Sequence, residues 1–111
     1  MKTVFVTGAS RGIGKSIALE LGKNYQVAVG FSNSQDKADE VVEEIKKLGG
    51  ESLSVQLNIE DRNSVDKAFN LIEEAYKHVD ILVNNAGITK DNILPRMKDD
   101  EWNDVIQTNL T

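Results

Sequence analysis

The strongest constraint on the fold is an alternation of short apolar runs with longer amphipathic segments along the 111 residues. Runs rich in β-branched and aliphatic residues cover 3–7, 26–31, 52–59 and 81–83, and each has the length of a buried strand. Apolar residues recur at helical spacing over about 13–23, 38–48 and 65–76. We expect Asp61 or Asn63 to cap the start of the third helix. Four strands alternating with helices predict an α/β fold with a parallel sheet and right-handed crossovers.

The last part of the chain predicts a fourth helix that begins near Asp99. One face of that helix would present Trp102, Val105, Ile106, Asn109 and Leu110. In a doubly wound, Rossmann-type sheet of order 3-2-1-4, the fourth strand lies at an edge, yet its continuous apolar run is typical of a strand with a neighbour on each side. The final helix also reaches Thr111 without a capping glycine. We therefore expect residues 1–111 to be the N-terminal half of one incomplete domain.

Composition argues against several classes of function. Thirteen Lys and Arg residues against eighteen Asp and Glu give a net charge of −5, which disfavours a nucleic-acid-binding face. No apolar run approaches the roughly 20 residues that cross a bilayer, and the apolar start before Gly8 is too short for a signal peptide. There is no cysteine, and His78, interpreted as a surface residue, is the one histidine. We expect a soluble, cytoplasmic protein without a metal site.

A glycine-rich turn, Thr-Gly-Ala-Ser-Arg-Gly-Ile-Gly at residues 7–14, connects the first predicted strand to the first helix. In this context Gly8 would permit the tight turn, Gly12 would let the backbone approach a pyrophosphate, and Gly14 would allow close packing of helix against strand. The helix N-terminus offers N–H groups and a positive dipole end to phosphates. The pattern predicts a dinucleotide site; the alternative interpretation is a structural turn with no ligand.

The residues after the second strand favour NADPH over NADH. NADH is usually held by an acidic residue about 20 positions beyond the glycines. Here the strand is followed by Ser32, Asn33 and Ser34, and the first acid is Asp36. No carboxylate would repel a 2′-phosphate, and Arg11 in the glycine turn would attract one. The alternative is that Arg11 is merely solvated.

Two motifs together resemble the short-chain dehydrogenase/reductases. The first is the glycine turn, and the second is Asn-Asn-Ala-Gly at residues 84–87, at the end of the fourth strand. Within this family, residues 79–92 and 96–110 are similar to the bacterial 3-oxoacyl-[acyl-carrier-protein] reductases. The resemblance implies an NADPH-dependent oxidoreductase that reduces a 3-oxoacyl thioester on acyl carrier protein to the (3R)-3-hydroxyacyl product in fatty-acid biosynthesis. It also implies a homo-oligomer, typically a tetramer.

The resemblance assigns roles to particular residues. The pyrophosphate and ribose would be lined by Gly8, Ser10, Arg11, Gly12, Ile13 and Gly14. Ser32 and Asn33 would lie near the 2′-phosphate, and Asn58 with Ile59 would contact adenine. The ribose on the nicotinamide side would be bordered by Asn85, Ala86 and Gly87. Asn84 would tie neighbouring strands together. Asn109 would be the asparagine of the family's catalytic tetrad, which positions a proton-relay water.

One departure from the family concerns the proton donor. The Tyr-x-x-x-Lys motif and its preceding serine would follow Asn109, and the chain ends first. Neither Tyr25 nor Tyr76 has a lysine four positions later. Because carbonyl reduction needs an acid for the developing alkoxide, we expect the 111 residues alone to be inactive. The alternative is a non-catalytic nucleotide- or partner-binding protein. Pro95, where the family more often has a straight-chain apolar residue, is a smaller departure.

Overall fold

The structure, a computed structural model, describes residues 1–10 and 12–85, together with the backbone of a strand at 104–107. Strands and helices alternate in the order β1 (Thr3–Thr7), α1 (Gly12–Leu21), β2 (Gln26–Phe31), α2 (Gln35–Lys47), β3 (Ser52–Gln56), α3 (Arg62–Tyr76), β4 (Ile81–Asn84) and β5 (Asp104–Gln107). This confirms the predicted α/β class and the four strand positions, although β3 ends at Gln56 rather than Ile59.

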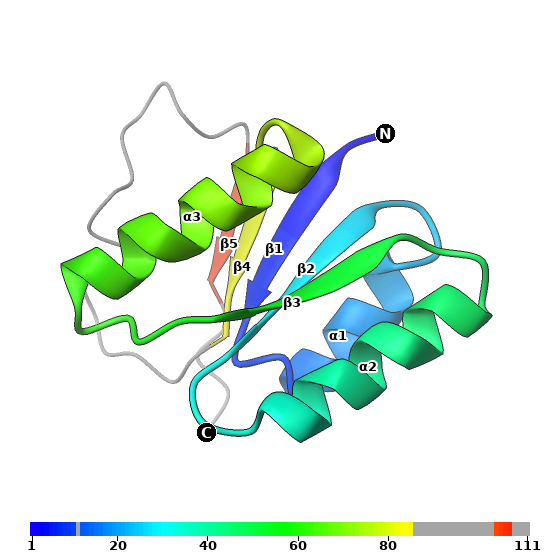
Figure 1. Cartoon of the computed structure of the whole chain (residues 1–111). Helices are drawn as coiled ribbons and strands as arrows, with labels where there is room; N and C mark the ends of the chain where they lie inside the picture. The colour runs from blue at the N-terminus through cyan, green and yellow to red at the C-terminus, as the bar shows by residue number, and fades with distance from the viewer. Residues whose placement is uncertain (11, 86–103, 108–111) are drawn as a thin grey trace.

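The strands form one parallel sheet of order β3-β2-β1-β4-β5. The predicted 3-2-1-4 arrangement is therefore confirmed, with β1 in the middle. Since all strands run the same way, the segments that follow β1, β2, β3 and β4 leave the sheet at one edge, which we call the carboxyl edge (Figure 1). Ligands of open α/β sheets bind at such an edge, next to the point where the strand order reverses.

Helices cover both faces of the sheet (Figure 1): α1 and α2 lie on one face and α3 on the other. The side chains of β1 alternate between the two cores. Val4 and Val6 pack with the buried residues of α2, whereas Phe5 packs on α3, where its ring meets the Phe69 ring edge-on at 5.4 Å between centroids. All three β1 side chains are fully buried. The continuous apolar run of this strand is explained by a position covered on both faces.

The predicted helix from Asp99 is wrong at residues 104–107, which form β5 and pair with β4. Val105 and Ile106 are β-branched, and β4 without β5 would leave a row of backbone groups unpaired. Pairing with a strand therefore outweighs the helical spacing of the apolar residues. The rest of that predicted helix lies outside the described residues.

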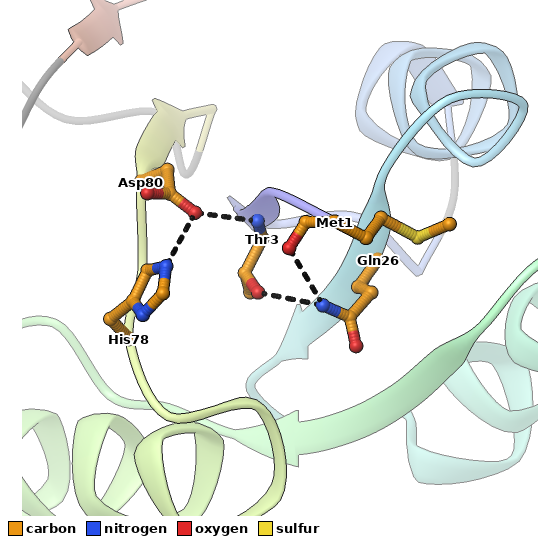
Figure 2. Close-up of polar contacts among 5 residues, drawn as sticks. All are labelled: Met1, Thr3, Gln26, His78 and Asp80. Carbon is orange, nitrogen blue, oxygen red and sulfur yellow. Dashed lines mark hydrogen bonds and ion pairs between the residues drawn. The ribbon is translucent and has the colours of Figure 1, made fainter.

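A polar network ties the strands together at the opposite, amino edge (Figure 2). The Asp80 carboxylate accepts hydrogen bonds from Thr3 N (2.9 Å) and contacts His78 Nε2 (3.2 Å). The Gln26 amide donates to Met1 O (3.1 Å) and to Thr3 Oγ1 (3.3 Å). Asp80 is 8% exposed as a residue, whereas the His78 side chain is 65% exposed. The network joins the start of β1 to β4 and β2, away from the carboxyl edge.

In the part of the chain that the structure describes, none of the helices combines the length and the apolar character that crossing a bilayer requires. Within the same residues no three His, Asp or Glu side chains gather in a way that could hold a metal ion.

Candidate functional site

The glycine turn follows β1 at the carboxyl edge, and its backbone requires glycine at three positions. Gly8 and Gly12 have φ of 62° and 63°, values that L side chains rarely adopt. A Cβ on Gly14 would collide with the carbonyl oxygen of Gly8 and lie 2.5 Å from Asn85 Nδ2. The tight turn at Gly8 and the close helix–strand packing at Gly14 are therefore present as predicted.

The turn is attached to strands on both sides of β1. The Ala9 N–H donates to the carbonyl of Gly30 at the end of β2 (2.9 Å). On the other side, Asn85 Nδ2 donates a longer hydrogen bond to Gly8 O (3.4 Å). A Cβ on Gly30 would lie 2.9 Å from the Phe5 ring and 3.0 Å from Val6 O, so glycine there lets β2 approach the turn. These contacts attach the turn both to β2 and to the residue that follows β4.

The Thr7 hydroxyl connects the turn to the residues after β4. It accepts a hydrogen bond from Asn85 N (2.9 Å) and lies 3.1 Å from Asn84 Oδ1, to which it can donate. Thr7 and Asn84 are buried, so these polar groups have little access to water. Asn84 was predicted to tie neighbouring strands together, and its contact with Thr7 of β1 shows this role in the structure.

The start of α1 suits a phosphate. Helix α1 begins at Gly12, and the first turn of an α-helix has N–H groups without intrahelical acceptors. Gly12 is exposed, and a Cβ placed on it would meet nothing within 4 Å. The first turn of α1 contains no acidic residue. An exposed Gly12, open space at its Cβ position and a first helical turn without an acidic residue are compatible with the pyrophosphate of a dinucleotide.

Three polar residues, Ser32, Asn33 and Ser34, connect β2 to α2 at the same edge. Ser32 and Asn33 are exposed. Ser34 is the N-cap residue of α2, but its side chain makes no capping hydrogen bond. The carbonyl of Ser32 accepts a hydrogen bond from Gln56 Nε2 at the end of β3 (3.1 Å). The two residues predicted to lie near a 2′-phosphate, Ser32 and Asn33, are thus exposed at the carboxyl edge.

The segment after β3 is ordered by its own side chains. Asn58 N donates to Ser64 Oγ (2.8 Å), and Asn58 Oδ1 accepts from Glu60 N (3.1 Å). Asn58 is exposed and Ile59 is partly buried against the α3-side core. The N-cap of α3 is Asp61, whose side chain accepts from Asn63 N (3.0 Å), which decides between the two capping residues that the sequence allowed.

Several of the predicted site residues lie outside the described residues, namely Arg11, Ala86, Gly87 and Asn109. The structure brings the glycine turn and Asn85 into contact, and it places the β2–α2 and β3–α3 connections along the same edge. Thr7 and Gly30 also fix the turn, and their role was not predicted from the sequence. A hydroxyl as the last residue of a buried strand, followed by glycine, was the available signal for Thr7.

Both tyrosines lie away from the carboxyl edge. Tyr25 immediately precedes β2, and Tyr76 is the last residue of α3. Burial raises the pKa of Tyr76 above the usual value of 10.0, and the nearby carboxylate of Glu51, just before β3, raises it further. Tyr76 lies at the amino edge, at the other end of the strands from the glycine turn, so it is not placed to donate a proton to a ligand there.

Comparison with known proteins gives matches over nearly the whole chain. The family described as short chain dehydrogenase matches residues 2–111. The 3-oxoacyl-[acyl-carrier-protein] reductase FabG of Staphylococcus epidermidis is 54% identical over 110 residues, which are 98% of this chain and 45% of that protein. The protein of the same name from Pseudomonas aeruginosa is 47% identical over 109 residues, 98% of this chain and 44% of that protein.

Solved structures of similar proteins also match most of the chain. A short chain dehydrogenase from Burkholderia cenocepacia in complex with NADP superimposes with a TM-score of 0.73 at 38% identity, covering 90% of this chain and 41% of that one. The landomycin C-6 ketoreductase LanV, with bound NADP and rabelomycin, gives 0.71 at 37% identity, covering 86% and 44%. The chain spans about half the length of the curated relatives that it matches. On the matched residues 2–111, the chain belongs to the short-chain dehydrogenase family.

Proposed function

We propose that residues 1–111 are the NADP-binding half of a domain that reduces 3-oxoacyl-[acyl-carrier-protein] to (3R)-3-hydroxyacyl-[acyl-carrier-protein] with NADPH, a step of fatty-acid biosynthesis. The observation that carries the proposal is the glycine turn, fixed by contacts with β2 and with Asn85 while the N-terminus of α1 stays open. The names of reductases that are 54% and 47% identical to this chain over the matched residues support the substrate class. The names of similar solved structures support NADP.

The proposed site residues follow the carboxyl edge. The pyrophosphate and its neighbouring ribose would be bound by Gly8, Ser10, Arg11, Gly12, Ile13 and Gly14. Ser32 and Asn33 would donate to the 2′-phosphate, and Asn58 and Ile59 would contact adenine. The second ribose would be bordered by Asn85, Ala86 and Gly87. The order of these segments along the edge matches an extended dinucleotide that crosses β1.

When bound, NADPH supplies a hydride to the carbonyl carbon of the substrate. The residues of this chain bind and orient it: the α1 N-terminus neutralises phosphate charge, and the Thr7 network keeps the β1 and β4 loops in register. The oxygen that develops negative charge needs a proton donor, which neither described tyrosine can supply. Asn109 would position a water in the proton relay, and the acid itself would come from residues beyond these 111.

Two finer features belong to the same proposal. The substrate would be presented by acyl carrier protein, and the enzyme would be a homo-oligomer, a tetramer as is typical of the family. The acidic balance of the chain, with a net charge of −5, gives no support for nucleic acid as a partner.

The test is NADPH binding and turnover by the full-length protein that contains this chain. We expect NADPH to bind and to be oxidised, followed at 340 nm, when a 3-oxoacyl thioester of acyl carrier protein is added. Gly12→Ala fills the open space beside α1 and should weaken NADPH binding by about tenfold or more.

Gly49→Ala is the matched control, because Gly49 also has a positive φ (92°) and open space around its Cβ position but lies at the end of α2. It should bind NADPH as the unchanged protein does. NADPH binding without any turnover of the thioester would favour the non-catalytic alternative. Equal weakening by both variants would argue against the assignment of the glycine turn.

A further inference from the structure

A single side chain on the neighbouring strand holds the loop between β2 and α2. Gln56, the last residue of β3, donates from Nε2 to the carbonyl of Ser32 (3.1 Å). The backbone pairing of β2 with β3 ends at the same place, where Phe31 is opposite Gln56 and Leu57 N donates to Phe31 O (2.8 Å). Gln56 therefore continues the attachment to β3 by one residue beyond the last backbone hydrogen bond.

The loop itself has few other restraints. Ser34, the N-cap of α2, has no side-chain capping bond, and its carbonyl accepts from Ala38 N within the helix start. Among the described residues, Gln56 supplies the one side-chain hydrogen bond to the loop backbone. This contact therefore restrains the backbone of the loop that carries Ser32 and Asn33.

We infer that Gln56 is a positioning residue that sets the preference for NADPH over NADH, by holding the β2–α2 loop ready for the 2′-phosphate. This inference rests on the proposed function. If the loop is fixed before binding, its donors need not be ordered when the phosphate arrives, and affinity rises accordingly. NADH lacks the phosphate and gains nothing from this order.

The test compares two variants in the full-length protein. Gln56→Met keeps the length of the side chain and removes its donor. Ser54→Ala is the matched control: it removes another β3 side-chain hydrogen bond, from Ser54 Oγ to Asp39 of α2 (2.8 Å), two residues earlier on the same strand. Dissociation constants for NADPH and NADH are measured by fluorescence titration, and thermal midpoints are measured without cofactor.

We expect Gln56→Met to raise the dissociation constant of NADPH about threefold, the range of one exposed hydrogen bond, and to leave that of NADH unchanged. Ser54→Ala should change neither constant, and both variants should have the thermal midpoint of the unchanged protein.

The inference is overturned if Gln56→Met leaves NADPH binding unchanged, if it weakens both cofactors in proportion, or if Ser54→Ala has the same effect. An unchanged protein that binds NADPH no better than NADH would instead overturn the proposed cofactor, which separates the two failures.

Discussion

Replacing Thr7 with valine tests whether its hydroxyl holds the glycine turn to β4. Valine has nearly the same shape, so the substitution removes the polar contacts and leaves the packing almost intact. It deprives Asn85 N of its acceptor at 2.9 Å and Asn84 Oδ1 of its contact at 3.1 Å. Thr7 and Asn84 are buried, so water does not readily replace the lost partner.

The expected loss of stability follows from those contacts. The loss of one hydrogen bond costs about 0.5–1.5 kcal/mol, so the loss of these two contacts of the Thr7 hydroxyl costs about 2 kcal/mol in all. Thr7→Ser is the matched control, because it keeps the hydroxyl and removes a methyl group worth about 1 kcal/mol.

The assay is reversible urea unfolding of the full-length protein at one protein concentration, since association shifts apparent stability. With a typical slope near 2 kcal/mol per molar urea, Thr7→Val should lower the midpoint by about 1 M, and Thr7→Ser by about half of that or less. A valine variant as stable as the serine variant would refute the reasoning.

Three further predictions use the same protein. In urea unfolding, Asp80→Ala should lower the free energy of unfolding by about 2 kcal/mol, because Thr3 N loses a buried acceptor. His78→Ala should change that free energy by less than about 0.5 kcal/mol, because the His78 side chain is largely exposed. Equal losses for the two variants would contradict this prediction. Gly14→Ala should destabilise by about 1–3 kcal/mol through its collision with Gly8 O and should weaken NADPH in a fluorescence titration; normal binding would contradict it. Because the pKa of Tyr76 is raised in the folded state, its neutral form adds stability that is present below pH 10 and is lost as the pH rises through the folded-state pKa. The free energy of unfolding, measured from pH 9 to 11, should show this loss, and Tyr76→Phe should reduce it. Identical pH profiles for the two proteins would refute the prediction.

Much of the fold was predictable because the short apolar runs of the strands and the helical spacing of apolar residues are both clear in the sequence. The strand β1 is apolar on both faces, and amphipathic helices bury their apolar faces by covering a parallel sheet on both sides. The roles of Gly8 and Gly14 were also predictable, since positive φ and close approach both require glycine. At residues 104–107 the helical spacing of Val105 and Ile106 was misleading, because their β-branched side chains and the open edge of β4 favour a strand.

The contacts that fix the site could not be predicted from local spacing. Asn85 reaches Gly8 across 77 positions, and Gln56 reaches Ser32 across 24. Such pairs depend on strand order and register, which bring together the ends of strands that are distant in sequence. The hydrogen bond between Ala9 and Gly30 has the same origin. The residue types indicated the candidate ligand-binding positions. The residues that hold these positions in place could be identified only once the strand order and register were known.

The middle position of β1 has a consequence for how the chain folds as it is made. Its contacts with β2 join residues 23 positions apart, whereas its contacts with β4 join residues 77 apart. Closing the longer loop costs about 1 kcal/mol more in chain entropy, and β4 also leaves the ribosome later than β2 and β3. Until residue 84 is available, the central strand of the finished sheet is an edge strand that carries Val4, Phe5 and Val6. A nascent or shortened chain that stops before β4 should therefore aggregate through this edge.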